Sequence, residues 1–296
     1  MTTKPGPRVR VITMVKNEQF MLGKWLEYYG GQFGRDRLMV IDDSSEDGST
    51  DGLDVPVLRI DSQKTHSGDF DFNRTQLVNQ IAQGLLLYDD YVIYTDADEF
   101  LVPDPDYCDT LPEFLALNPD LDVVAGVGLN VLHNVREEPA FDPTQGILQQ
   151  RHYAKFARRY CKPLIKRIPN KWGKGFHSVG RKYSISTSLY LLHLKWYDLG
   201  TSLERQGLRY SKMVETGAGR NMSWRLKPED MESRYLAWCD PDKHGHNPPV
   251  FSPTPDLIAD VVEAGEQGMW RSGNPKTPSA MKGPLFRIPE RLSNVF

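Results

Sequence analysis

The ten residues YVIYTDADEF, at positions 91–100, join an apolar run to three carboxylates, Asp96, Asp98 and Glu99. The apolar run predicts a buried β-strand, and we expect that strand to extend over residues 91–100. Residues two apart on a strand share a face, so Asp96 and Asp98 can reach one cation at the strand end. Mg²⁺ and Mn²⁺ prefer oxygen ligands, usually one or two carboxylates with phosphate and water. The stretch therefore predicts a strand that ends in a metal-binding loop.

The preceding residues alternate between short apolar runs and helical spacing. The pattern predicts strands at 9–15, 37–43 and 55–60, and helices at 17–33 and 72–87. Strands separated by helices indicate a parallel sheet with helices on its faces, and ligands bind such sheets beyond the carboxyl ends of the strands. Three predicted strand ends carry polar residues there: Lys16-Asn17-Glu18, Asp42-Asp43 and Asp96-Ala97-Asp98.

The pattern loosens after about residue 125. We expect strands at 121–132 and 161–167, a strand or helix at 188–199, helices at 202–215 and 227–238, and a helical stretch at 256–267. Beyond Asp240 the chain is rich in proline and glycine. The composition of this tail does not decide whether it wraps the domain or covers a site.

The composition is that of an ordinary globular protein, with 296 residues, 39% apolar and 25% charged. No window approaches the roughly 20 apolar residues that span a bilayer, and the first residues lack the pattern of a secretory signal. We therefore expect a cytoplasmic protein, with peripheral membrane contact left open. The three cysteines form no CxxC pair, which favours buried free thiols over zinc or redox chemistry.

The net charge of −3 conceals an uneven distribution. Residues 151–182 contain eleven Lys or Arg and no Asp or Glu, whereas acids crowd residues 42–54 and 89–109. An acidic and a basic region on one chain suit a metal-bound polyanion, a nucleic-acid surface or an ordinary solvated face.

Residues 11–53 and the run YVIYTDADEFLV at 91–102 resemble the nucleotide-binding half of family-2-like glycosyltransferases of the GT-A fold, in the subgroup whose second motif reads DxDEF. The resemblance covers about residues 8–105, with weaker echoes at Lys162-Pro163, Phe176-His177 and His193. It implies an α/β fold of GT-A type, with a Rossmann-like, mostly parallel central sheet flanked by helices, a mixed acceptor-side region and an extended C-terminal segment. The implied divisions are a donor-binding half at 1–125, an acceptor-side half with the basic segment at 126–215, and C-terminal helices with a Pro/Gly-rich tail at 216–296.

The resemblance further implies transfer of a sugar from a nucleotide-sugar donor, UDP-linked, to a hydroxyl of a carbohydrate or glycoconjugate acceptor, with inversion. In the implied site Mn²⁺ or Mg²⁺ is held against the diphosphate, and a late histidine completes the metal shell and favours Mn²⁺. The implied donor-site residues are Thr13, Val15, Asn17 and Glu18 around base and ribose, Asp42 and Asp43 as acceptors for the base, Asp96 and Asp98 on the metal, and His193, or in second place His177, as the late histidine.

Transfer also needs cations for the leaving diphosphate and a base for the acceptor proton. We expect Lys162, Lys166 or Arg167 to supply the cation, and the resemblance implies that Arg74, on the helix before the metal-binding strand, touches phosphate. The candidates for the base are Glu99, Glu137, Glu138 and Asp198, of which Glu99 is better suited to orienting the metal or a basic side chain.

Two other functions remain open at this point. A nucleotidyl or phosphoryl transferase could use the same acids, with Glu99 as the third carboxylate of a two-metal site. A non-catalytic RNA-binding protein could use residues 151–182, although the chain is acidic overall and shows no RNA-binding motif there. The lack of GxGxxG and Walker A motifs disfavours a dehydrogenase and a P-loop enzyme.

Overall fold

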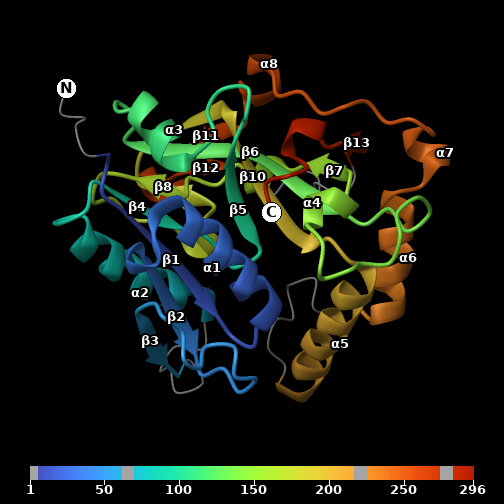
Figure 1. Cartoon of the computed structure of the whole chain (residues 1–296), viewed down its shortest axis with the longest axis horizontal. Helices are drawn as coiled ribbons and strands as arrows, with labels where there is room; N and C mark the ends of the chain where they lie inside the picture. Colours follow the sequence, from blue (N-terminus) through green and yellow to red (C-terminus); the bar gives the residue numbers. More distant parts are fainter. Residues whose placement is uncertain (1–5, 62–69, 217–225, 274–282) are drawn as a thin grey trace. The chain divides into compact units, whose positions relative to one another are not determined.

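A computed structural model of the protein describes residues 6–61, 70–216, 226–273 and 283–296 (Figure 1). The chain divides into two compact units, each assembled from three separate segments. Unit 1 comprises Met1–Gly128, Arg158–Leu192 and Pro253–Thr277, and unit 2 comprises Leu129–Ala157, His193–Ser252 and Pro278–Phe296.

The centre of unit 1 is a parallel sheet of four strands: β1 (Val9–Val15), β2 (Leu38–Asp43), β3 (Val57–Ile60) and β4 (Tyr91–Tyr94). Their order across the sheet is β4-β1-β2-β3, and all three pairings are parallel. Most residues of these strands are apolar and none is proline; β1, β2 and β4 are largely buried, whereas the edge strand β3 is partly exposed. The predicted mostly parallel α/β sheet is confirmed.

Two long helices flank this sheet. Helix α1 (Gln19–Phe33) leads from β1 to β2, and helix α2 (Phe70–Leu85) lies between β3 and β4 in the sequence. The connection from β1 to β2 runs toward the β3 edge of the sheet, and the connection from β3 to β4 runs in the opposite direction. Because such connections are right-handed, the two helices lie on opposite faces of the sheet. Helix α1 buries Met21, Trp25 and Tyr29, whose spacing predicted its inner face.

The rest of unit 1 extends the sheet with antiparallel strands. Strand β8 (Ile165–Lys166) pairs with β4, and the first part of β6 (Val123–Leu132) pairs with β8. The other elements of the unit are α3 (Leu111–Leu117), β5 (Glu99–Pro103), the first part of β10 (Ser184–Trp196), α8 (Pro255–Ile258), the 3₁₀ turns at Arg35–Arg37, Arg158–Tyr160, Lys174–Phe176 and Glu266–Gly268, and a three-stranded antiparallel sheet of β11 (Val262–Ala264), β12 (Trp270–Ser272) and β9 (Ser178–Val179).

Unit 2 is built on the last part of β6, which pairs with β7 (Tyr153–Phe156), and β7 pairs in turn with β13 (Phe286–Arg287). Helices α5 (Leu199–Thr216) and α6 (Pro228–Trp238) pack around an apolar cluster that contains Leu132, Trp196 and Tyr235. The short elements of the unit are α4 (Ile147–Gln150), α7 (Pro241–His244) and a 3₁₀ turn at Glu290–Leu292.

Two local predictions were wrong. The strand expected over 91–100 ends at Tyr94. The chain then turns, with the Glu99 amide donating to the Asp96 carbonyl at 3.0 Å, and a separate strand, β5, begins at Glu99. The helix expected over 256–267 is one turn, α8, followed by strand β11. The strand-or-helix stretch at 188–199 is mostly strand, within β10. Across the residues that the structure describes, no helix is long and apolar enough to cross a membrane.

Candidate active site

The carboxyl ends of the four parallel strands share one edge of the unit 1 sheet. Lys16 and Asn17 follow β1, Asp42 and Asp43 end β2, Asp61 follows β3, and the acidic loop 95–98 follows β4. This edge is where open α/β sheets bind ligands. Thr13 and Val15 lie inside β1 with 0% and 3% exposure, so only Asn17 and Glu18 of the four residues expected around base and ribose stand beyond the strand.

Hydrogen bonds join the loops after β1 and β2. The Asn17 side-chain oxygen accepts from the Glu46 amide at 2.8 Å, and the Asn17 amide donates to Ser45 Oγ at 3.0 Å. Asn17 and Ser44 both have positive φ, 54° and 53°, a backbone conformation that side chains other than glycine rarely adopt. Such backbone persists where surrounding contacts fix it, and it gathers at functional sites.

Asp42 is committed to the turn after β2. It is fully buried; one carboxylate oxygen accepts from the Ser45 amide and the other from the Thr50 hydroxyl, each at 2.9 Å, and Arg59 Nε lies 3.3 Å away. Burial alone would raise the pKa of Asp42, but the hydrogen bonds from Ser45 and Thr50, with the charge of Arg59, bring it below its usual value. Because the Asp42 side chain is fully buried, a base could reach it only if this turn moved.

The acidic loop after β4 is surrounded by donors. Asp96 Oδ1 accepts from the Arg74 guanidinium at 2.9 Å and from the Tyr94 hydroxyl at 3.0 Å, and Lys162 Nζ lies 3.6 Å from Asp96 Oδ2. Asp96 and Asp98 are both half-buried. Below the loop, Trp25 Nε1 of α1 donates to the Thr95 hydroxyl at 2.7 Å, which fixes the loop to the helix.

Glu99 and Lys162 form a buried ion pair at the base of this loop. Their exposures are 1% and 3%, and Lys162 Nζ donates to Glu99 Oε1. Burial raises the pKa of Glu99, as do Asp96 and Asp98, although Lys162 opposes the shift. Burial alone would lower the pKa of Lys162, but Glu99 and Asp96 raise it, so the amine stays charged. Glu99 thus holds Lys162 in place, consistent with its expected orienting role.

Lys162 is the only one of the three expected cations that lies beside the acidic loop. Lys166 is fully buried, donates to the Asn170 carbonyl at 2.6 Å and sits 3.5 Å from the centre of the Trp172 ring. Arg167 donates to the Pro119 carbonyl. Burial lowers the pKa of Lys166 to about 7. Neither Lys166 nor Arg167 is therefore placed as a partner of a diphosphate at this edge.

The two candidate histidines belong to different units. His177 lies in unit 1, and its Nδ1 is 2.7 Å from the Arg159 carbonyl; because a carbonyl only accepts, Nδ1 carries the hydrogen and Nε2 the lone pair. Burial, together with the charge of Lys162, lowers the pKa of His177 to about 3, which keeps the ring neutral. His193 lies in unit 2, 4% exposed, with Nδ1 2.7 Å from the Asn130 side-chain oxygen. Within the described ranges, no three His, Cys, Asp or Glu side chains are gathered as metal ligands.

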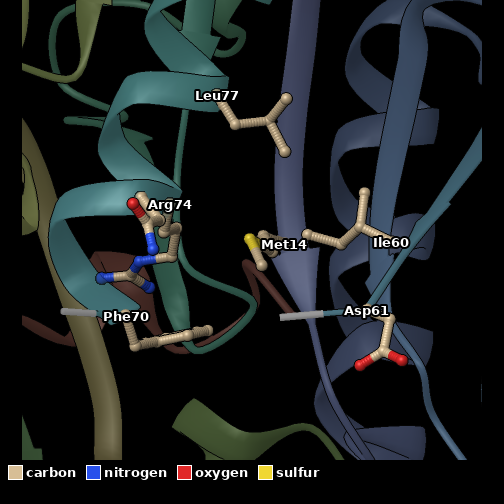
Figure 2. A pocket seen from close by; sticks show the side chains of 7 residues that line it. Met14, Ile60, Asp61, Phe70, Arg74 and Leu77 are labelled. Carbon is tan, nitrogen blue, oxygen red and sulfur yellow. The ribbon is translucent and has the colours of Figure 1, made fainter. Parts of the chain in front are cut away.

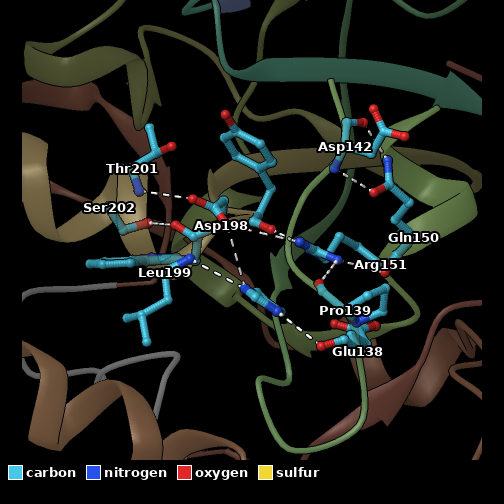
Figure 3. A network of polar contacts seen from close by, with 12 residues as sticks. Glu138, Pro139, Asp142, Gln150, Arg151, Asp198, Leu199, Thr201 and Ser202 are labelled. Atoms are coloured by element: carbon cyan, nitrogen blue, oxygen red, sulfur yellow. Dashed lines mark hydrogen bonds and ion pairs between the residues drawn. The ribbon is translucent and has the colours of Figure 1, made fainter. Parts of the chain in front are cut away.

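The other base candidates belong to unit 2 (Figure 3). Glu138 is 8% exposed, and its two carboxylate oxygens accept from the Asn134 amide at 2.7 Å and the His152 amide at 2.6 Å. Asp198 accepts from the Thr201 amide at 2.8 Å, at the start of α5. Contact with His133, chiefly, lowers the pKa of Asp198 to about 2, a poor value for a base at neutral pH. Both carboxylates support the backbone of unit 2.

Sequence reasoning did not anticipate how much of the basic segment is interior. Four of its eleven Lys and Arg side chains are buried: Arg151, Lys155, Lys162 and Lys166, all between 0% and 3% exposed. Arg151 donates to the Tyr197, Pro139 and Gln150 carbonyls and lies 3.9 Å from Asp198 (Figure 3). Arg151, Lys155 and Lys166 donate to backbone carbonyls and do not face solvent, so the segment is a weak candidate for an RNA-binding surface.

A cavity of about 230 Å³ lies beside α2 at the same edge of unit 1. Met14 of β1, Ile60 at the end of β3, and Phe70 and Leu77 of α2 give it apolar walls, and Asp61 and Arg74 contribute charge. Figure 2 shows the Phe70 ring extending from the helix toward the strands, and the Met14 sulfur pointing back toward the helix. No sequence motif marks Asp61 or Phe70 as functional; the available signal is the position of Asp61 directly after a predicted strand.

Comparison with known proteins gives only remote similarity. No protein-family model and no curated protein match the chain. Two of the similar solved structures are transferases. The mannosyltransferase PcManGT from Pyrobaculum calidifontis, in complex with GDP-Man and Mn²⁺, is 17% identical with a TM-score of 0.36, over 78% of this chain and 70% of that chain. The mannose-1-phosphate geranyltransferase from Thermus thermophilus is 14% identical with a TM-score of 0.28, over 41% of each chain. Similarity this remote does not indicate an activity for this chain.

Proposed function

We propose that the protein is a metal-dependent glycosyltransferase that transfers a sugar from a nucleoside-diphosphate donor to an acceptor hydroxyl. The observation that carries the proposal is the acidic loop after β4 at the carboxyl edge of a parallel sheet, where Asp96 lies beside the cations Arg74 and Lys162 and Asp98 follows two residues later. Carboxylates of this kind bind hard divalent cations, and Arg and Lys side chains bind phosphate oxygens, so the loop combines the groups that a metal-bound diphosphate needs.

The charge of the cluster fits a divalent cation. In their usual ionised forms, the acids Asp71, Asp96, Asp98 and Glu99 and the cations Arg74 and Lys162 leave two negative charges. Asp96 and Asp98 would hold Mn²⁺ or Mg²⁺, and His177 is the candidate histidine of the same unit. A bound divalent cation would supply neutralisation of the charge that grows on the departing nucleoside diphosphate.

The protein's own residues would do the remaining electrostatic work. Lys162, held by Glu99, keeps its positive charge in a buried setting, where its attraction for a phosphate oxygen would be strong. Arg74 is fixed between the Phe70 and Phe176 rings, 5.8 and 5.3 Å from their centres, and directs its guanidinium to the acidic loop.

A nucleotidyl or phosphoryl transferase is less well supported. Two-metal chemistry would need a third carboxylate beside Asp96 and Asp98, and the expected one, Glu99, is buried and paired with Lys162.

The test is thermal stabilisation by nucleoside diphosphates with and without Mn²⁺. At about 100 times the dissociation constant, a ligand stabilises the folded state by roughly 2.7 kcal/mol. We expect that stabilisation in the wild type only when the metal is present, and its loss in Asp98→Asn. The control Asp36→Asn, an exposed acid at the opposite end of β2, should behave as the wild type. No shift with any nucleotide and metal would refute the proposal.

A further inference from the structure

The ring of Phe176 contacts two residues of the acidic site that come from different elements. It is fully buried and stacks on the ring of Tyr94, at the end of β4, with 3.8 Å between the ring centres and 21° between the planes. The guanidinium carbon of Arg74, in α2, lies 5.3 Å from the centre of the same ring. One side chain thus supports a residue of the sheet and a residue of the helix beside it.

These two residues are donors to the same carboxylate oxygen. Oδ1 of Asp96 accepts from the Arg74 guanidinium at 2.9 Å and from the Tyr94 hydroxyl at 3.0 Å. Two directional hydrogen bonds from separate elements restrict the rotation of the carboxylate. Hydrogen bonds of this kind orient a carboxylate that binds a metal, and their loss weakens metal binding. Removal of the Phe176 ring would give both donors additional conformational freedom.

The backbone at Phe176 shows that the ring is held in place against local strain. Phe176 has φ 61°, directly after Gly175 with φ 68°. Positive φ is ordinary for glycine but strained for a bulky side chain. Strained backbone persists where surrounding contacts hold it, and it gathers at functional sites. Here the contacts are the Tyr94 stack, an edge-on contact with the Trp172 ring at 5.8 Å and a 2.9 Å hydrogen bond from the Phe176 amide to the Gly173 carbonyl.

We infer that Phe176 is a positioning residue, which holds Arg74 and Tyr94 on Asp96 and thereby orients this carboxylate for the metal. The inference rests on the proposed function and adds a residue that acts through its neighbours rather than by contact with a ligand. Ordinary core packing predicts only a loss of stability when the ring is removed. The positioning role predicts a loss of ligand affinity in protein that remains folded.

The test is calorimetric titration of the full chain with Mn²⁺ and whichever of ADP, CDP, GDP and UDP binds the wild type. Phe176→Leu removes the ring but keeps an apolar side chain, and we expect it to weaken binding about tenfold. The matched control is Phe114→Leu, at a fully buried ring of unit 1 in α3, which should leave the affinity within about twofold because this ring supports no donor to Asp96. Circular dichroism verifies that each variant is folded, and Phe176→Met replaces Phe176→Leu if the latter does not fold.

A double-mutant cycle with Arg74→Met separates positioning from general structural damage. If the ring acts through Arg74, Phe176→Leu should weaken binding by less than about threefold in the Arg74→Met background, because only Tyr94 is then left to be held. A purely structural role predicts the same factor in both backgrounds. Phe114→Leu should show that additivity.

The outcomes separate this inference from the function on which it rests. An unchanged affinity in Phe176→Leu, an equal loss in Phe114→Leu, or the same loss with and without Arg74 overturns the positioning role and leaves a metal-dependent nucleotide site standing. The absence of binding by every nucleoside diphosphate with Mn²⁺ in the wild type overturns both.

Discussion

The amine of Lys166 is buried inside unit 1. Among the described residues, no carboxylate forms an ion pair with it. Its amine donates to the Asn170 carbonyl and packs on Trp172, whose ring partly offsets the missing counter-ion. A buried charge that lacks a full partner lowers the stability of the folded state, and replacement by an apolar side chain of similar length is often stabilising.

We expect Lys166→Met to stabilise the protein at pH 7 by about 1 kcal/mol or more. Because burial lowers the folded-state pKa from 10.5 to about 7, the unfolded chain holds the extra proton between those values. The wild type's penalty is therefore complete below about pH 7 and fades as the pH rises toward 10.5, and the gain from Met should shrink in that range. Urea unfolding at several pH values measures it; the exposed Lys171→Met is the control, and a gain that does not vary with pH would contradict the burial argument.

The acidic residues show what sequence could and could not reveal about the site. The order of strands and the spacing of Asp96 and Asp98 placed these acids at the sheet edge, because periodicity reports which end of a strand a residue occupies. Arg74 and Lys162 were among the cations expected at the diphosphate, but their pairing with Asp96 was not foreseeable. Arg74 and Lys162 lie 22 and 66 residues from Asp96 in the sequence, and only the packing of α2 and of residues 158–192 brings them to the loop.

Secondary structure could be predicted where a local sequence pattern determines it. The prediction was wrong where pairing with a distant segment determines it. Strands β1 to β3 and helices α1 and α2 follow from apolar spacing inside their own sequences. Strand β11 does not, because it exists through pairing with β12, which in turn pairs with β9, some 90 residues earlier. The helical spacing across residues 256–267 could not show that pairing with β12 would favour a strand over a helix at residues 262–264.

Two glycines predict opposite responses to alanine. Gly23 lies inside α1, and an added Cβ would meet nothing within 4 Å, so Gly23→Ala should stabilise by about 0.5–1 kcal/mol through helix propensity. Gly128 lies in β6, where an added Cβ would come within 2.5 Å of the Tyr160 backbone, so Gly128→Ala should destabilise by about 1–3 kcal/mol. Denaturant midpoints of both variants measure the pair. An unchanged midpoint for Gly128→Ala would show that the Tyr160 segment yields at little cost.

At the scale of the whole molecule, each unit contains strands from the last part of the chain, after Ser252. Strands β11 and β12 belong to unit 1, and β13 pairs with β7 of unit 2, so the Pro/Gly-rich tail contributes sheet to both. Composition could not reveal this role, since two- and three-residue strands carry almost no periodic signal.

We expect a chain that stops at Ser252 to lose stability in both units. It would lack the buried side chains Val261, Leu285 and Leu292 and the strands they accompany. Each buried aliphatic side chain contributes on the order of 1.5–3 kcal/mol, so the loss approaches the whole stability of a typical domain. Urea unfolding followed by circular dichroism, with limited proteolysis, measures the effect. A truncated chain that unfolds cooperatively at the wild-type midpoint would show that the tail is dispensable.

Arg74 lines the cavity and also holds Asp96, and this double contact has a thermodynamic consequence. In the free protein a cation that approaches Asp96 competes with a guanidinium already in place, so we expect the metal alone to bind weakly. A diphosphate that attracts the guanidinium would release the carboxylate for the metal. Metal and nucleotide would then be cooperative ligands, each raising the affinity of the other by the same factor.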